Sequence, residues 1–233
     1  GTRTLTWSGG TSGATALLMQ ITNESNVVPV FVNSADNAST GTGVLTINKP
    51  TNTQEGDFMI AIMAAGQSNN DTWTGDTGWT EVADANQAPN LRVAYKVAGA
   101  SEGSTYTFTN TGSGAGKSVA GCILTYRGAA YDTIGSFVFA NSTNITIPSI
   151  ILSSSQSVLI AASVKRTSGI SLSVSPVMTS RVSQTAISPS YTVWDQIGLP
   201  ICASGTGDRV SSGGSTADSQ GILIGLKPNR LIY

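Results

Sequence analysis

The residues that could support catalysis are few and scattered in this chain of 233 residues. The chain has no histidine, which removes Ser-His-Asp and Cys-His nucleophilic catalysis and most zinc sites. Ser-Lys and paired-carboxylate chemistry would still be open to it, but the acidic residues are dispersed and form no recurring pair. We therefore expect a protein that is not an enzyme, with no catalytic residue, no metal site and no cofactor.

One glycine-rich segment resembles a phosphate-binding loop. Residues 112–118 read GSGAGKS, and in such loops the backbone N–H groups hold phosphates while the lysine reaches them. The first glycine of the motif, six residues before Lys117, is replaced by Thr111. The surrounding pattern is strand–turn–strand, whereas the motif requires a helix after the loop. A hairpin turn is the better interpretation.

A second polar segment, NNDTWTGDTGW at residues 69–79, has the most distinctive surface chemistry. Its carboxylate and amide oxygens could coordinate Ca²⁺, but their spacing matches no EF-hand, and Asn, Asp and Gly are ordinary turn formers. The indole of Trp73 has a flat apolar face that could stack on a sugar, whereas Trp79, at the start of a strand, is expected in the core. The candidate glycan-binding residues are Trp73, Asp71, Asp76 and Asn70.

The composition indicates an uncharged polar surface. Only 11% of the residues are charged, against about 25% in ordinary soluble domains, and the net charge is −1. Basic residues do not cluster, so nucleic-acid binding, which depends on Lys and Arg against phosphate, is not expected. No apolar run approaches the roughly 20 residues that a membrane-spanning helix needs. The chain opens in a strand-like segment without a methionine or a signal sequence, so we expect it to be part of a longer polypeptide.

The clearest feature of the sequence is an internal repeat. GDFMIAIMAAG at 56–66 aligns with QSVLIAASVKR at 156–166, and LRVAYKVAG at 91–99 aligns with YTVWDQIGL at 191–199. Offsets between the copies lie between about 100 and 106 throughout. Three further segments share an alternating strand, a Gly/Ser/Thr stretch and an apolar strand, which is the pattern of a β-hairpin. They are residues 3–21, 105–126 and 209–226.

The repeat predicts tandem domains with an unmatched piece at the N-terminus. We place β-sandwich units at residues 27–130 and 131–233, preceded by a partial unit or docking hairpin at residues 1–26. In the other phasing, the first hairpin opens a unit and the last is left over. A hairpin without its own sandwich exposes an apolar face, so we expect it to pack on a neighbouring domain or subunit. The candidate assembly residues are Leu5, Trp7, Leu17, Met19 and Ile21.

Each unit should contain about seven strands. In Arg92–Val97 apolar and polar residues alternate, as in a half-buried strand, while Phe58–Ala65 is apolar throughout, as in a central strand covered on both faces. Short strands with regular turn residues predict an all-β fold of tandem β-sandwich domains, Ig-like or jelly-roll. The strands expected in the first unit are Pro29–Asn33, Gly43–Asn48, Phe58–Ala64, Thr80–Asp84, Leu91–Val97, Thr105–Asn110 and Gly121–Arg127.

The two cysteines, Cys122 and Cys202, fall in different units. A disulfide-stapled scaffold would carry more cysteines at closer spacing. We therefore expect both to be small buried side chains that do not pair with each other.

The stretch from Gly78 to Gly128 resembles a known repeat. It carries GWT at residues 78–80, YKVA at 95–98, YTF at 106–108 and YRG at 126–128. These segments are similar to a β-sandwich repeat encoded in many tailed-bacteriophage virion proteins and some secreted bacterial surface proteins. The second unit departs from the pattern, with VMT at 177–179 and GLK at 225–227. The resemblance implies a virion appendage, decoration or adhesin role and carries over no catalytic residue.

The expected function is that of a non-enzymatic structural or adhesive module of a bacteriophage virion. It would be a fibre, head decoration or tail component whose end loops contact host-surface glycans. Expected partners are other virion or filament subunits, including copies of this chain, and a cell-surface glycan, with neither nucleic acid nor membrane insertion. The alternatives are a bacterial extracellular filament or surface-adhesin subunit, and the carbohydrate-binding module of a secreted enzyme. The expected location is the virion, or the extracellular space or cell surface for the alternatives.

Overall fold

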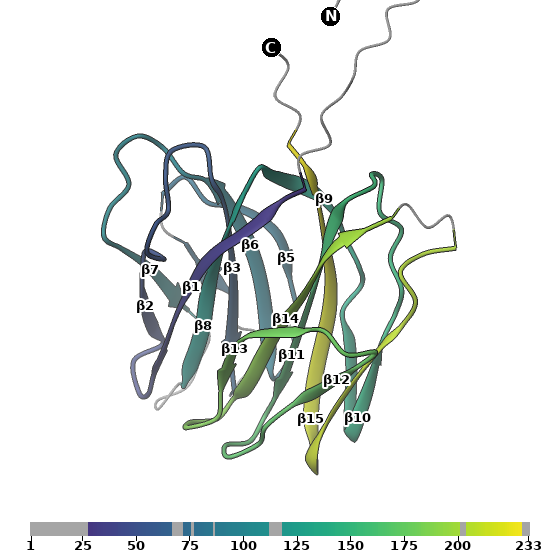
Figure 1. Cartoon of the computed structure of the whole chain (residues 1–233). Helices are drawn as coiled ribbons and strands as arrows, with labels where there is room; N and C mark the ends of the chain where they lie inside the picture. The colour runs from purple at the N-terminus through teal and green to yellow at the C-terminus, as the bar shows by residue number, and fades with distance from the viewer. Residues whose placement is uncertain are drawn as a thin grey trace, which may run out of the picture.

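The computed structural model describes residues 28–66, 72–75, 77–85, 87–111, 118–200 and 204–229. Within this part of the chain every regular element is a β-strand, and all strand pairs are antiparallel (Figure 1). The prediction of an all-β chain is therefore confirmed. The strands form two large sheets and one small sheet.

The first large sheet and the small sheet come from the first half of the chain. The strands of the large sheet are β1 Val30–Ser39, β3 Phe58–Ala65, β5 Thr80–Asp84, β6 Asn90–Val97 and β8 Val119–Arg127. They lie in the order β1-β8-β3-β6-β5. The small sheet has the order β2-β7-β4, with β2 Val44–Asn48, β4 Trp73–Thr74 and β7 Thr105–Asn110. The central strand β3 is buried along its whole length, as its unbroken apolar sequence predicts.

The second large sheet comes from the second half of the chain. Its strands are β9 Ala129–Ile134, β10 Val138–Ile147, β11 Ser157–Lys165, β12 Ser173–Ser175, β13 Thr179–Gln184, β14 Ser190–Leu199 and β15 Arg209–Pro228. Its main order is β10-β15-β11-β14-β13, and β9 and β12 also pair with β15. The long strand β15 changes partners along its length: its first residues pair with β12 and its last residues with β9 and β11.

The two large sheets repeat one pattern of strand pairing at a spacing of 100 residues. Phe58 pairs with Val97 in the first sheet, and Val158 pairs with Ile197 in the second. The strands β1 and β9 also carry a bulge at equivalent positions. The internal repeat seen in the sequence therefore extends to the hydrogen-bonding register.

Two of the predicted hairpins are wrong. β7 and β8, within residues 105–126, do not pair with each other: β7 joins the small sheet and β8 the large one. Residues 209–226 belong to the single strand β15, and both of its halves pair with β10. The local sequence pattern is the same whether two successive strands pair with each other or cross between layers, so only tertiary contacts distinguish the two. The third predicted hairpin, residues 3–21, lies outside the described residues.

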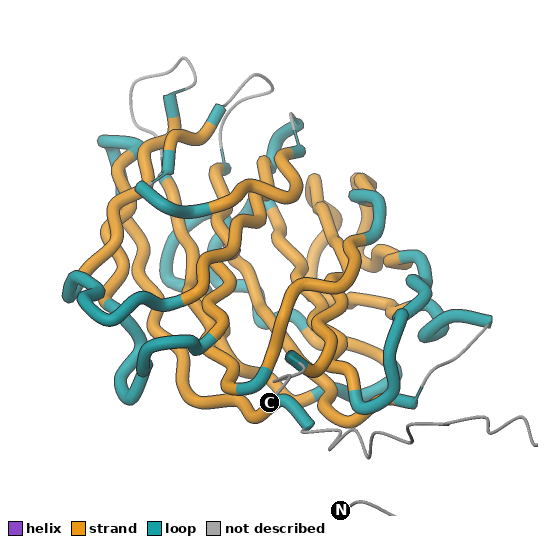
Figure 2. The backbone as a smooth tube through the Cα atoms, turned by 90° about the horizontal axis from the view of Figure 1, so that it is seen from above, coloured by secondary structure: helices purple, strands orange, loops and turns teal. Residues whose placement is uncertain are grey.

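Apolar cores lie between successive layers of the fold. One core lies between the two large sheets and includes Ile60 and Leu124 from the first and Ile160 and Val193 from the second. A second core lies between the first large sheet and the small sheet, and a third covers the outer face of the second large sheet. The two halves of the chain, blue and green to yellow in Figure 1, are therefore packed face to face. Figure 2 shows the strands inside this stack and the loops at its periphery.

The chain enters and leaves the described fold at the same end. Val30, the first residue of β1, pairs with Arg127. Asn229, which follows β15, donates its backbone N–H to the Gly128 carbonyl at 2.8 Å. Because Arg127 and Gly128 are neighbours in the chain, both ends of the fold lie beside the same turn, at the top of Figure 1. A longer polypeptide would approach and leave the stack on one side.

Gly121 and Gly221 occupy equivalent positions but have different surroundings. A Cβ on Gly121 would lie 2.7 Å from the backbone oxygen of Ile62, whereas on Gly221 the nearest atoms, also at 2.7 Å, are side-chain carbons of Ile147. A side chain can move aside more easily than a central strand. We therefore expect Gly121→Ala to lower the free energy of unfolding by about 3 kcal/mol and Gly221→Ala by about 1 kcal/mol. Urea unfolding measures both, and equal losses would contradict this difference in surroundings.

The turn before each central strand contains a residue with positive φ. This residue is Gly56 (φ 82°) before β3 and Gln156 (φ 60°) before β11. A left-handed conformation costs a residue with a Cβ about 1–2 kcal/mol, so Gln156→Gly is expected to raise the free energy of unfolding by about 1 kcal/mol. Gly56→Ala is the matched control, because a Cβ there meets no atom within 4 Å, and it should have the opposite sign. Unchanged melting temperatures for both variants would refute the expectation.

Candidate functional site

The structure places Trp73 in the core instead of on a sugar-binding surface. Its side chain is 5% exposed, packs in the core between the first large sheet and the small sheet, and donates from Nε1 to Asn90 Oδ1 at 2.6 Å. No ring face is open to a sugar, so the stacking role predicted for Trp73 is corrected. The polar sequence around it indicated a surface loop, but the two-residue strand β4 joins β7 and turns the indole inward.

Of the other residues singled out in the sequence, the structure describes Trp79 and Cys122. Trp79 is partly buried against the same core, with edge-to-face contacts to Tyr106 and Phe108 at centroid distances of 5.3 and 5.5 Å, as predicted. Cys122 is a free buried thiol. Several predicted residues lie outside the part of the chain that the structure describes. They are Asn70, Asp71, Asp76 and Cys202, and the assembly residues Leu5, Trp7, Leu17, Met19 and Ile21.

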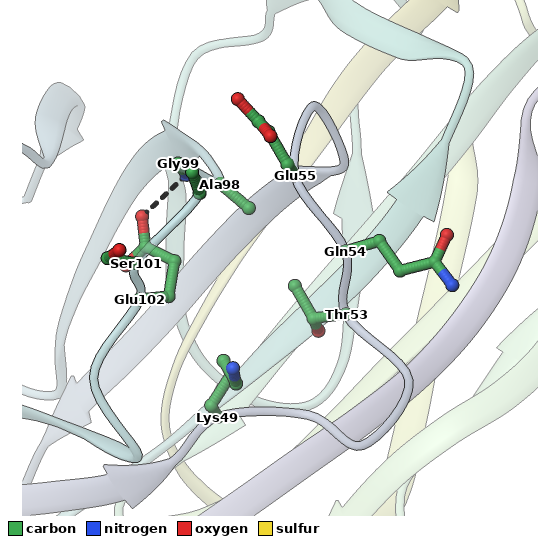
Figure 3. A pocket seen from close by; sticks show the side chains of 9 residues that line it. Lys49, Thr53, Gln54, Glu55, Ala98, Gly99, Ser101 and Glu102 are labelled. Carbon is green, nitrogen blue, oxygen red and sulfur yellow. Dashed lines mark hydrogen bonds between the residues drawn. The ribbon is translucent and has the colours of Figure 1, made fainter.

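A polar cavity of about 280 Å³ lies beside the ends of β2 and β6 (Figure 3). Glu102 accepts hydrogen bonds there from the Gly99 backbone N–H and the Tyr106 hydroxyl, both at 2.8 Å, and Lys96 Nζ lies 2.9 Å from it. Burial by itself raises the pKa of Glu102, but these donors outweigh it and lower the pKa overall. Both carboxylate oxygens are occupied, so Glu102 stabilises the turn and is poorly suited to proton transfer.

A second cavity, of about 420 Å³, opens at the edge of the second large sheet. Val177 and Ile197 line it and are 87% and 36% exposed. Arg181 and Gln196 add polar groups to the lining. The combination of exposed apolar side chains and a guanidinium at a sheet edge is suited to binding an extended peptide segment.

Beside this cavity a set of side chains crosses the interface between the two large sheets. We call Phe31, Tyr126, Arg181 and Asp195 the inter-sheet cluster. Asp195 is 1% exposed and accepts hydrogen bonds from the Tyr126 hydroxyl and from Arg181 Nε, both at 2.8 Å. The Arg181 guanidinium lies 3.9 Å from the centroid of the Phe31 ring, which contacts Tyr126 edge-to-face. The cluster thus connects β1 and β8 of one sheet to β13 and β14 of the other.

A buried thiol and two buried tyrosine hydroxyls occupy the same interface. Burial raises the pKa of Tyr126, and the neighbouring Asp195 carboxylate raises it further. Burial also raises the pKa values of Cys122 and Tyr191, which lie close to each other. All three groups therefore stay protonated and neutral at physiological pH. Because they are enclosed between two sheets, they can hold the sheets together but cannot receive a substrate.

Neither relatives nor metal ligands assign a function to this chain. Comparison with protein-family models, with curated proteins and with solved structures finds no match. Among the described residues, no three Cys, Asp or Glu side chains lie close enough together to hold a metal ion. In the same residues there is no helix with the length and apolar character to cross a membrane.

Sequence reasoning missed the inter-sheet cluster, although one signal for it was present. Tyr191, Val193 and Asp195 alternate on one face of β14, and the two neighbours of Asp195 on that face belong to the apolar core. The equivalent of Asp195 in the first repeat is Tyr95. A carboxylate on an apolar face requires a buried partner. The identity of that partner, Tyr126, depends on the packing of the two sheets and could not be read from the strand itself.

Proposed function

We propose that this chain is a non-enzymatic structural module of a bacteriophage particle, made of two tandem β-sandwich units and projecting from the particle surface. The observation that carries the proposal is that the chain enters and leaves the described fold beside one turn. A spacer within a fibre needs its two connections at opposite ends, whereas a module attached at one end stands away from its support. Among the virion roles, this geometry favours a head decoration or a tail-surface component over an in-line fibre segment.

Rigidity is a further argument for a projecting module. The two units share a core and are joined by the buried inter-sheet cluster, so they should move as one body. Units joined by a linker alone would move independently. The low charge and the Ser, Thr and Asn content of the chain suit a surface exposed outside a cell. The likeness of residues 78–128 to a repeat of phage virion and bacterial surface proteins supports the same location.

The proposal is tested by locating the chain in its native setting. Antibodies raised against the full chain should label phage particles from the source culture at regular surface positions in immunogold electron microscopy. Labelling of cell-attached filaments would support a bacterial surface subunit instead. Recovery of the chain only in secreted material, fused to a hydrolase domain, would support a carbohydrate-binding module. Either of these results would refute a virion role.

A further inference from the structure

The cavity at the edge of the second large sheet lies where β14 extends beyond its pairing with β13. β13 pairs with β14 from Gln184 up to Thr179, which lies opposite Asp195. β14 continues to Leu199, but beyond Asp195 no described strand pairs with its outer side. Met178 and Val177, which precede Thr179, line the cavity together with Gln196 and Ile197 but form no ladder with them. Among the described strands, Gln196–Leu199 therefore has no partner on that side, and we call this stretch the open edge. An open strand edge with exposed apolar side chains is a template for an added strand.

The first repeat closes the equivalent position with its own side chains. There Lys96 covers Gly78, with Cε 3.5 Å from where a Cβ would lie, and its Nζ pairs with Glu102 at 2.9 Å. In the second repeat Gln196 stands at the position of Lys96. Its side-chain Oε1 accepts a hydrogen bond from Arg209 Nη2 at 3.1 Å. The two repeats thus share a backbone position that is filled in one and open in the other.

Arg181 supplies a charged group at the open position. Its Nε is bound to Asp195 and its guanidinium is stacked on Phe31, so the planar group is held in one orientation. Among the described residues its two Nη nitrogens have no partner. A guanidinium with free Nη groups is suited to receive a carboxylate.

We propose that residues 14–24 of this chain occupy the open edge as an added strand. The segment reads ATALLMQITNE, in which Leu17, Met19 and Ile21 alternate and would share one face, against Val177 and Ile197. Glu24 is the one acidic residue before Val28 and is the group that would meet Arg181.

The length of the chain allows this arrangement. Phe31 already contacts Arg181, and Glu24 lies seven residues before Phe31, a span of up to about 25 Å when extended. A segment tethered this close has an effective concentration on the order of millimolar, which favours docking within one molecule over docking between molecules. The proposal does not depend on the virion role.

Disulfide trapping in the full chain tests the proposal. In a Cys202→Ser background, the test variant combines Met19→Cys with Val177→Cys. The matched control combines Met19→Cys with Val44→Cys, because Val44 is 37% exposed and lies on the far small sheet. Cys122 is fully buried and can stay. Under mild oxidation of dilute protein, we expect the 19–177 bond to form within monomers at least tenfold faster than the 19–44 bond. Adding Glu24→Gln should slow it severalfold.

Disulfide trapping can contradict the proposal in two ways. Equal rates for the two pairs, or no bond at 19–177, would overturn the proposal. A 19–177 bond found only between two molecules would overturn it in favour of docking by a second copy. Hydrogen exchange gives an independent readout. Val177→Asp should speed exchange of the amides of residues 196–199 at least tenfold while Val44→Asp leaves them unchanged, and unchanged exchange in both variants would also refute the proposal.

Discussion

Replacing Asp195 by alanine is expected to lower the free energy of unfolding by about 3–5 kcal/mol, the usual effect of removing one partner from a buried ion pair. The Asp195 carboxylate accepts from both Tyr126 and Arg181 across the interface between the two large sheets. Its loss leaves a buried hydroxyl and a largely buried guanidinium without their acceptor. Urea unfolding at pH 7, followed by tryptophan fluorescence, measures the change.

The control for this prediction is an ion pair at the surface. Arg166 and Asp218 lie 3.4 Å apart, and both side chains are partly exposed. Arg166→Gln should cost no more than about 1 kcal/mol. If Asp195→Ala cost no more than Arg166→Gln, the inter-sheet cluster would not be a significant source of stability.

Stability is expected to fall steeply as the pH rises above about 9. Burial raises the pKa values of Cys122, Tyr126 and Tyr191 above their ordinary values of 9.0, 10.0 and 10.0. In alkali the unfolded chain loses these protons first, so the folded state binds more protons and the free energy of unfolding decreases with pH. Each such group contributes about 1.4 kcal/mol per pH unit once the unfolded form has titrated. By pH 11 we expect a loss of about 3–5 kcal/mol relative to pH 8.

One buried base acts in the opposite direction. Lys165 donates to the carbonyls of Thr143 and Gly213, and burial lowers the pKa of its ammonium group from 10.5. Between the lowered pKa of the folded state and pH 10.5, Lys165 therefore binds a proton more often in the unfolded chain than in the folded chain. In this pH range the lysine makes the free energy of unfolding rise with pH. Urea midpoints from pH 8 to 11 should fall less steeply for Cys122→Ala and more steeply for Lys165→Met. A flat profile for the parent chain would contradict the prediction.

The positions of several strands were determined by the sequence alone. Phe58–Ala65 is apolar throughout and became the central strand β3. Predicted and observed bounds agree for Thr80–Asp84 and Thr105–Asn110. Turn residues bound these segments, so the ends of these strands follow from local sequence. β15 is the exception, because it runs through a Gly/Ser stretch that predicted a turn. The all-β class follows from the same local pattern.

The choice of partners was decided only by the tertiary structure. A crossover between layers and a hairpin have the same local pattern, which is why β7–β8 and β15 were misassigned. Trp73 lies in a polar segment, yet it is buried because β4 joins β7. Asp195 is paired with Tyr126, 69 residues earlier in the chain. The physical reason is that hydrogen bonding along a strand edge and burial of a sheet face depend on which surfaces meet, and distant segments of the chain determine this.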